Sequence, residues 1–170
     1  MTDSPTNVQG YFKRYTDLVN ETTLASAFTA QSTVIKELLP KITEEKSTFA
    51  YAEGKWTIKE VLQHLIDAER VFAFRALCFS RKEAATLPSF DENDYAVNSN
   101  ANNRSWQNLV DEFLAVRRST ILLFESFDQQ MLHCMGTAGS NILSAEQLGY
   151  ITVGHFTHHS NVLAERYFTV

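Results

Sequence analysis

The sequence has few of the residues that turn-rich chains require, with six glycines and three prolines among 170 residues. A protein built from many short strands needs both residue types at its frequent turns, so the composition disfavours a β-sandwich or a β-barrel. The apolar fraction of 44% is ordinary for a chain that buries a core, and the length is typical of one domain. We therefore expect one all-α domain over residues 1–170, with residues 1–20 as an N-terminal extension.

Other absences limit the partners and the location of the protein. No cluster of Lys and Arg exceeds an adjacent pair and the formal net charge is -5, so nucleic acid is not an expected partner. The N-terminus lacks the apolar stretch of a signal peptide, and no window approaches the roughly 18 apolar residues of a membrane span. Cys78 and Cys134 form neither a disulfide framework nor a Cys-x-x-Cys pair. These features predict a cytoplasmic protein with no membrane partner.

Apolar residues recur at three-and-four spacing in four stretches, which predicts four long helices and a bundle architecture. Capping boxes at Thr57–Glu60 and Ser144–Gln147 mark the starts of the second and fourth helices, and Ser105 caps the third. Pro40 lies inside the first helix and is expected to kink it. The helices are expected over residues 21–46, 57–82, 105–127 and 144–167. The stretch 8–19 is compatible with a short extra N-terminal helix.

Two connections lack this periodicity. Residues 87–104 are rich in Asn, Asp, Ser and Pro and predict an irregular segment that is too long for a simple turn. Connections of that length in compact domains often form functional lids. Residues 128–141 contain two glycines and predict a second loop.

The five histidines are unevenly placed in this pattern. On the fourth helix His155 and His159 lie one turn apart on the expected inward face, and His64 lies on the apolar face of the second helix. Imidazoles four residues apart lean over the same patch, so both can reach one ion at about 2.1 Å, with His64 as a third ligand. His158, about 100° away around the helix, is expected to border the site or to face another helix, and not to be a ligand. His133 is expected to lie on the surface.

Three protein ligands leave coordination positions open for water or substrate, which is typical of a catalytic metal rather than a closed structural one. Ligation by imidazoles alone suits zinc, nickel, copper or iron. From spacing alone, the alternative stays open that each histidine is a separately hydrogen-bonded core residue. Zincin peptidases need a glutamate after the first histidine of such a pair, and Phe156 occupies that position, so peptidase activity is not expected.

Three segments of the chain resemble the DinB-like superfamily of damage-inducible proteins and bacillithiol- or mycothiol-dependent transferases. They are YAEGKWTIKEVLQHLIDAER from Tyr51, LPSFDENDY from Leu87, and GHFTHH from Gly154 onward to Tyr167. The specific features are a tryptophan ahead of a capped helix and a distant His-x3-His pair, and the resemblance extends from about residue 20 onward. It implies an up-and-down four-helix bundle, often homodimeric, in which His64, His155 and His159 hold a divalent transition metal.

The resemblance leaves two classes of function open, because fold and metal ligands transfer within a superfamily better than a reaction does. The first is a metal-dependent S-transferase that joins a low-molecular-weight thiol, such as bacillithiol, to an electrophilic small molecule. For this enzyme we expect Asp67 to orient a ligand imidazole or act as a base, and Tyr95, Arg104 and Asp91 to contact thiol or substrate. The alternative for these four is a solvated surface role. The second class is a non-catalytic metal-binding stress protein with a structural or interaction role.

Overall fold

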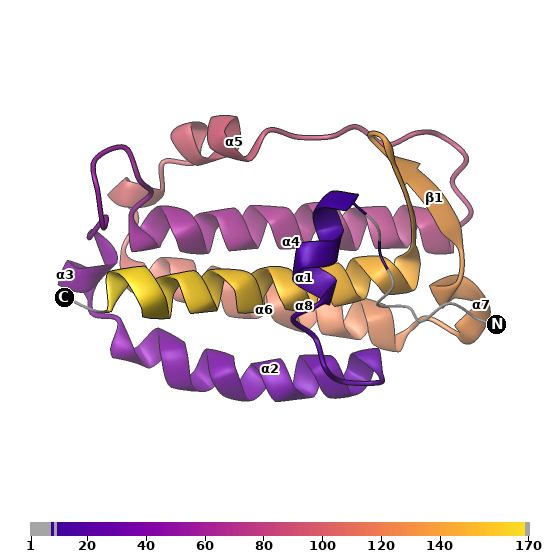
Figure 1. Ribbon diagram of the computed structural model, residues 1–170, viewed down its shortest axis with the longest axis horizontal. Coiled ribbons are helices and arrows are strands. Elements are labelled where there is room, and N and C mark those ends of the chain that lie inside the picture. Colours follow the sequence, from indigo (N-terminus) through magenta and orange to yellow (C-terminus); the bar gives the residue numbers. More distant parts are fainter. Residues whose placement is uncertain (1–7, 9, 169–170) are drawn as a thin grey trace.

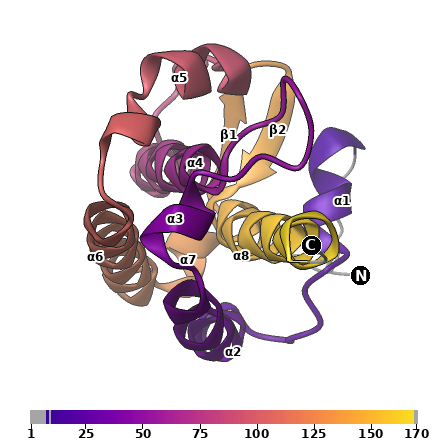
Figure 2. The same cartoon turned by 90° about the vertical axis from the view of Figure 1, so that its left-hand side faces the viewer.

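Four long helices lie side by side in the computed structural model, which describes residue 8 and residues 10–168 (Figure 1). They are α2 (Leu24–Leu38), α4 (Ile58–Ser80), α6 (Trp106–Glu125) and α8 (Ala145–Val162). Seen from one end, the helices surround a common interior (Figure 2). The expected all-α four-helix bundle is therefore confirmed, with one small two-stranded sheet added to it. Over the described ranges, no helix combines the length and the apolar character that crossing a membrane would take.

The helices do not simply alternate in direction. Lys59, at the start of α4, donates from Nζ to the carbonyl oxygen of Arg104 at 2.6 Å, just before α6 begins. Glu44 accepts hydrogen bonds from the same lysine and from the backbone N–H of Trp106. α4 and α6 therefore begin at the same end of the bundle, and the chain between them runs back along its length (Figure 1).

The first helix is shorter than predicted, and the expectation of one helix over residues 21–46 is wrong. α2 ends at Leu38 because Pro40 has no backbone N–H with which to continue the helical ladder. Ile42 is then extended, with φ −98° and ψ 113°. Thr43 starts a new helical turn by accepting from the N–H of Lys46. The segments that replace the second half of the predicted helix are η2 (Leu39–Lys41) and α3 (Glu44–Ser47).

The predicted starts of the other three helices are confirmed. The Thr57 hydroxyl accepts from the N–H of Glu60, and the Glu60 carboxylate accepts from the N–H of Thr57 at 2.7 Å. Ser144 and Gln147 form the same reciprocal pair at the start of α8. Ser105 caps α6 with its hydroxyl. These caps satisfy N–H groups that have no partner within the helix, so each start is decided locally.

Short elements occupy both connections that the sequence predicts to be irregular. The Asp91 carboxylate accepts from the N–H groups of Asn93 and Asp94 and caps a short helix. In the second connection two strands pair antiparallel, and Gly139 adopts φ +58° in the turn between them. The additional elements are η1 (Gly10–Phe12), α1 (Lys13–Thr16), α5 (Glu92–Asn98), η3 (Ala101–Asn103), α7 (Gln129–Leu132), β1 (Met135–Ala138), β2 (Asn141–Ser144) and the π-helical turn η4 (Leu163–Tyr167).

A buried polar network ties all four long helices together. Arg117 of α6 pairs with Glu69 of α4, with Nη2 and Oε2 at 2.8 Å, and both side chains are almost fully buried. Arg117 also donates to Gln31 of α2. Gln31 in turn donates to the carbonyl oxygen of Val153 in α8 at 2.5 Å. Since buried charges and amides require partners, this network fixes α8 relative to the other three helices.

Candidate metal centre

Three imidazoles from two helices converge inside the bundle. His64 of α4 and His155 of α8 are 8% and 4% exposed, and their Nε2 atoms lie 3.0 Å apart. His159 follows one turn later on α8, and one ligand atom from each of the three lies within 4.8 Å of the others. Two nitrogens about 2.1 Å from one tetrahedral ion are separated by roughly 3.4 Å. The arrangement thus has the size of a three-histidine metal site.

Burial keeps these imidazoles in the form that binds metals. Burial, with a smaller contribution from His158, lowers the pKa of His64 to about 4. Burial, with smaller contributions from His64, His158 and Arg14, lowers the pKa of His159 to about 2. The pKa of His155, which is fully enclosed, also lies well below its ordinary value, again mainly through burial. All three are therefore neutral at pH 7, and neutral imidazole is the ligand form. The donor set fits a divalent transition metal.

Aromatic rings pack against two of the three imidazoles, those of His64 and His155. The ring of Tyr15 meets His155 edge-on with a centroid distance of 4.9 Å, and Trp56 packs against His64 at the same distance. Phe72, two turns after His64 on α4, packs against His155 at 5.7 Å. Gly154 allows the first contact, because a Cβ there would lie 2.0 Å from the carbonyl oxygen of Tyr15. The missing side chain lets the backbone of α1 rest directly on α8.

A cavity of about 270 Å³ adjoins the triad. Its volume is near the lower end of small-molecule sites, so it suits a small ligand. The wall includes Arg14 and Tyr15 of α1, Phe72 and Arg75 of α4, and Phe90 and Glu92 at the approach to α5. Three histidines without a fourth protein ligand in the described ranges, next to such a cavity, leave room for a small molecule to reach a bound ion.

The sequence pattern of the DinB superfamily matches residues 27–163. The chain belongs to the DinB superfamily. Among solved structures, YfiT from Bacillus subtilis has a TM-score of 0.66 to this DinB chain at 16% sequence identity, over 83% of this chain and 86% of YfiT. YfiT is described as a probable metal-dependent hydrolase with an unusual four-helix bundle topology. At 16% sequence identity, the similarity to YfiT shows a shared fold and no more. No curated protein matches the chain in sequence.

Three other residues singled out in the sequence lie outside the cavity wall of this DinB protein. Asp67 accepts from Gln63 at 2.9 Å and faces α6, where burial raises the pKa of its carboxyl. Arg104 donates to the same glutamine at 2.6 Å and pairs with Glu112. Tyr95 packs on Phe90, with ring centroids 5.0 Å apart, and is largely exposed. The proposed role of Asp67 in orienting a ligand imidazole or acting as a base stays a prediction. So do the proposed contacts of Tyr95, Arg104 and Asp91 with thiol or substrate, and Asp91 caps α5.

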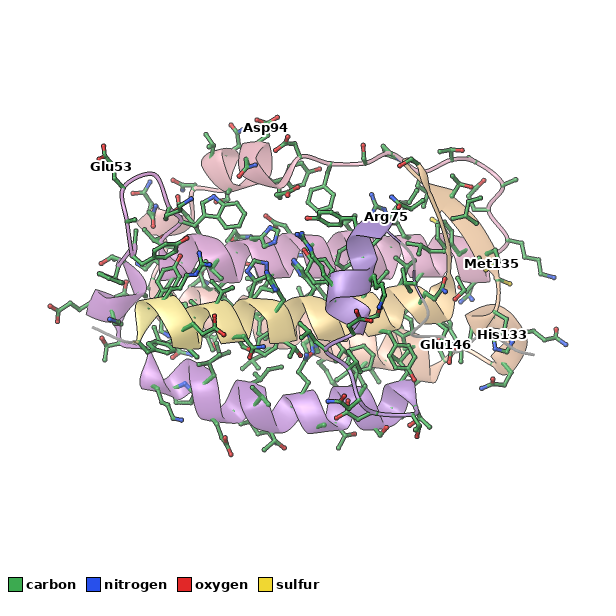
Figure 3. The ribbon with its side chains drawn as sticks, in the orientation of Figure 1. Glu53, Arg75, Asp94, His133, Met135 and Glu146 are labelled. Carbon is green, nitrogen blue, oxygen red and sulfur yellow. The ribbon has the colours of Figure 1, made fainter. Side chains whose placement is uncertain are left out.

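The two remaining histidines lie where the sequence places them. His158 borders the cavity and meets Tyr15 edge-on at 5.5 Å. His133 is exposed beside α7 at one end of the bundle, with its Nε2 3.8 Å from a carboxylate oxygen of Glu146 (Figure 3).

Sequence reasoning missed two contributors to the cavity of this DinB chain. The first is the N-terminal segment with Arg14 and Tyr15, which the periodic pattern treats as an extension outside the bundle. The second is Arg75. A signal for it exists, because residues 64, 68, 72 and 75 fall on one face of a helix, and a charged residue continues that inward face. Only the packing of α1 and of the segment before α5 shows that this face lines a cavity.

Proposed function

We propose that the protein is a metal-dependent S-transferase. In this proposal His64, His155 and His159 hold one divalent transition-metal ion, and a low-molecular-weight thiol attacks an electrophilic small molecule beside it. The sulfur forms a bond to an electrophilic carbon, the leaving group departs with its electron pair, and the thiol proton goes to solvent. The observation that carries the proposal is the cluster of three neutral imidazoles next to the cavity, two of them buried and His159 partly buried.

The chemistry of the donor set favours a thiol as the nucleophile. A divalent ion held by three imidazoles supplies a Lewis acid that lowers the pKa of a thiol or water in contact with it. In the described ranges no carboxylate or cysteine joins the histidine cluster, so no general base lies among the ligand atoms. A free thiol has a pKa of about 8.5 and water about 15.7, so a site with no base among its ligand atoms activates a thiol more readily than water.

The protein side chains contribute by enclosing the reacting groups. Tyr15, Trp56 and Phe72 pack directly against the imidazoles and keep bulk water from them. Exclusion of water strengthens electrostatic interactions with a bound ion and protects a nucleophilic sulfur from competing solvent. The same rings leave the cavity side open, which gives a small molecule one direction of approach.

Hydrolysis is a second candidate, and one observation favours it. The carboxylate of Glu92 lines the cavity and is available as a base for water. The hydrolase description of YfiT is consistent with that reaction. A non-catalytic metal-binding role is the third outcome that the experiment below separates. Homodimerisation, cytoplasmic location and damage-inducible expression stay predictions.

The test combines metal analysis with two activity assays on the purified chain. We expect about one equivalent of zinc, nickel, copper or iron, and a metal-dependent transfer of cysteine, glutathione or bacillithiol to monochlorobimane with release of chloride. His155→Ala should lose metal and transfer, whereas His133→Ala, which changes an exposed histidine away from the site, should retain both.

Each other outcome has a distinct meaning. Metal binding with ester or amide hydrolysis and no thiol transfer would favour the hydrolase candidate. Metal binding with neither activity would favour the non-catalytic role. A chain that binds none of these metals at neutral pH would overturn the metal site itself.

A further inference from the structure

One arginine in the cavity wall is buried with no counter-ion among the residues that the structure describes. Arg75 is 5% exposed and donates from Nη2 to the carbonyl oxygen of Pro88 at 2.7 Å. Across residue 8 and residues 10–168 it forms no ion pair with a carboxylate. By contrast, Arg117, which is equally buried, is fully paired with Glu69. A buried charge is costly unless an opposite charge compensates it, so Arg75 is suited to bind an anionic group of a ligand.

The remaining donors of Arg75 are not sealed in the core. Among the described side chains no buried nitrogen or oxygen atom lacks a hydrogen-bond partner. The guanidinium nitrogens not engaged with Pro88 therefore keep some exposed surface, and Arg75 lines the cavity beside the triad as well as a second pocket bordered by Phe74 and Tyr95. Burial also lowers the pKa of Arg75, and no carboxylate contributes in the opposite direction. Figure 3 labels Arg75 beside α1 and below the segment that leads to α5, in agreement with the residues that share its cavity.

The cavity connects this arginine with the histidine triad along one face of α4. His64, Ala68, Phe72 and Arg75 all line it. Eleven residues of helix rise roughly 16 Å, and long side chains lean toward the helix N-terminus, which brings the guanidinium back toward His64. Ala68 leaves space between the two ends because its side chain stops at Cβ. The cavity therefore suits an extended ligand with one end at the triad and the other at Arg75.

A second cation has a similar position. Arg14 lines the same cavity, stacks over the ring of Tyr11 at 3.8 Å and donates to the Tyr15 hydroxyl at 2.7 Å. It too has no carboxylate partner in the part of the chain that the structure describes. Glu92 is the only carboxylate among the described lining residues, and it pairs with neither arginine. With neutral histidines, positive charge predominates in the wall.

We propose that Arg75 binds a carboxylate group on the small molecule whose other end reaches the triad. The planar guanidinium matches a carboxylate in two-point hydrogen bonding, and Phe72 and Phe90 cover the apolar body between the ends. This inference rests on the proposed function, because it assigns the substrate class of the same site. It restricts that class to acidic small molecules.

The test compares two pairs of ligands that differ only in their acidic group. Mercaptohexanoate and mercaptohexanol are titrated calorimetrically into the zinc-loaded protein, and hexanoate and hexanol are titrated in parallel. We expect each acid to bind more tightly than its alcohol by on the order of tenfold, the effect of one charge-assisted hydrogen-bonded pair. This preference should disappear in Arg75→Met and in Arg75→Gln, which keeps a donor for Pro88. Arg75→Lys should retain part of it.

Arg70→Gln is the matched control. Arg70 lies on the same helix, pairs with Glu112 and does not line the cavity, so this variant should keep the full acid preference. Equal binding of acid and alcohol by the wild-type protein would overturn the proposal, and so would an unchanged preference in both neutral Arg75 variants. The hexanoate pair carries no thiol, so it tests Arg75 even if mercaptohexanol fails to bind and the S-transferase function is wrong. Transfer assays then show whether the thiol or the electrophile carries the carboxylate group. The one whose affinity falls in Arg75→Gln is the one that Arg75 binds.

Discussion

Gly154→Ala should destabilise the protein by separating α1 from α8. The added Cβ would lie 2.0 Å from the carbonyl oxygen and 2.4 Å from the carbonyl carbon of Tyr15, whereas ordinary contact begins at 3.4 Å. Both atoms belong to the backbone, so α1 as a whole must move by more than an ångström. Overpacking of this kind costs about 1–3 kcal/mol, and the better helix propensity of alanine offsets up to about 1 kcal/mol of that. Because the clash is with backbone atoms rather than a side chain that can rotate away, the cost lies near the upper end of that range, and we expect a net loss of about 2 kcal/mol.

The measurement is the free energy of unfolding in urea, together with the melting temperature. For a chain of this length the loss corresponds to a decrease in melting temperature of roughly 4 to 8 °C. Gly149→Ala is the matched control on the same helix, because its Cβ meets the methyl groups of Leu24 at 2.5 and 2.8 Å, and a side-chain end can move aside. Metal content should not change in Gly154→Ala, since the three imidazoles lie on α4 and α8. The reasoning would be refuted if Gly154→Ala were as stable as the wild type, or no less stable than Gly149→Ala.

Three further predictions concern the buried network, the partly buried carboxyl group of Asp67 and the metal. Arg117→Met leaves Glu69 buried without a partner, so urea unfolding should show a loss of about 3–5 kcal/mol, and Glu69→Leu in the same chain should restore part of it. Burial raises the pKa of Asp67, so its ionisation disfavours the folded state, and this penalty is complete at neutral pH and absent below the unfolded pKa. Asp67→Asn should therefore be more stable than the wild type at pH 7, and denaturation curves should converge as the pH falls below about 4. Zinc at a thousandfold excess over its dissociation constant should raise the free energy of unfolding by about 4 kcal/mol, measured by scanning calorimetry. This increase should be absent in His155→Ala.

Local signals in the sequence are sufficient to predict where three of the four long helices start. Thr57 and Ser144 satisfy helix N–H groups within three residues of themselves, so the starts of α4 and α8 can be predicted without knowledge of the fold. Pro40 indicates an interruption of the first helix, but a kink and a complete end of the helix both start from the same missing N–H. The helix ends here because Thr43 caps a new helical turn, α3. The helix α5 and the β1–β2 hairpin were missed because elements of seven and four residues are too short for a periodic pattern.

Spacing along the chain is enough to place His155 and His159 on one helix face, because side chains four residues apart on an α-helix lie over the same patch wherever the helix lies. The apolar pattern around His64 likewise places it on the inward face of another helix. That these two faces meet follows only from the packing of α4 against α8, which brings the Nε2 atoms of His64 and His155 to 3.0 Å. Packing also places Tyr15 of the N-terminal segment over the site, and it leaves Arg75 in the cavity wall with no carboxylate partner among the described residues. Burial and charge pairing depend on atoms far apart in the chain, and no spacing within one segment encodes them.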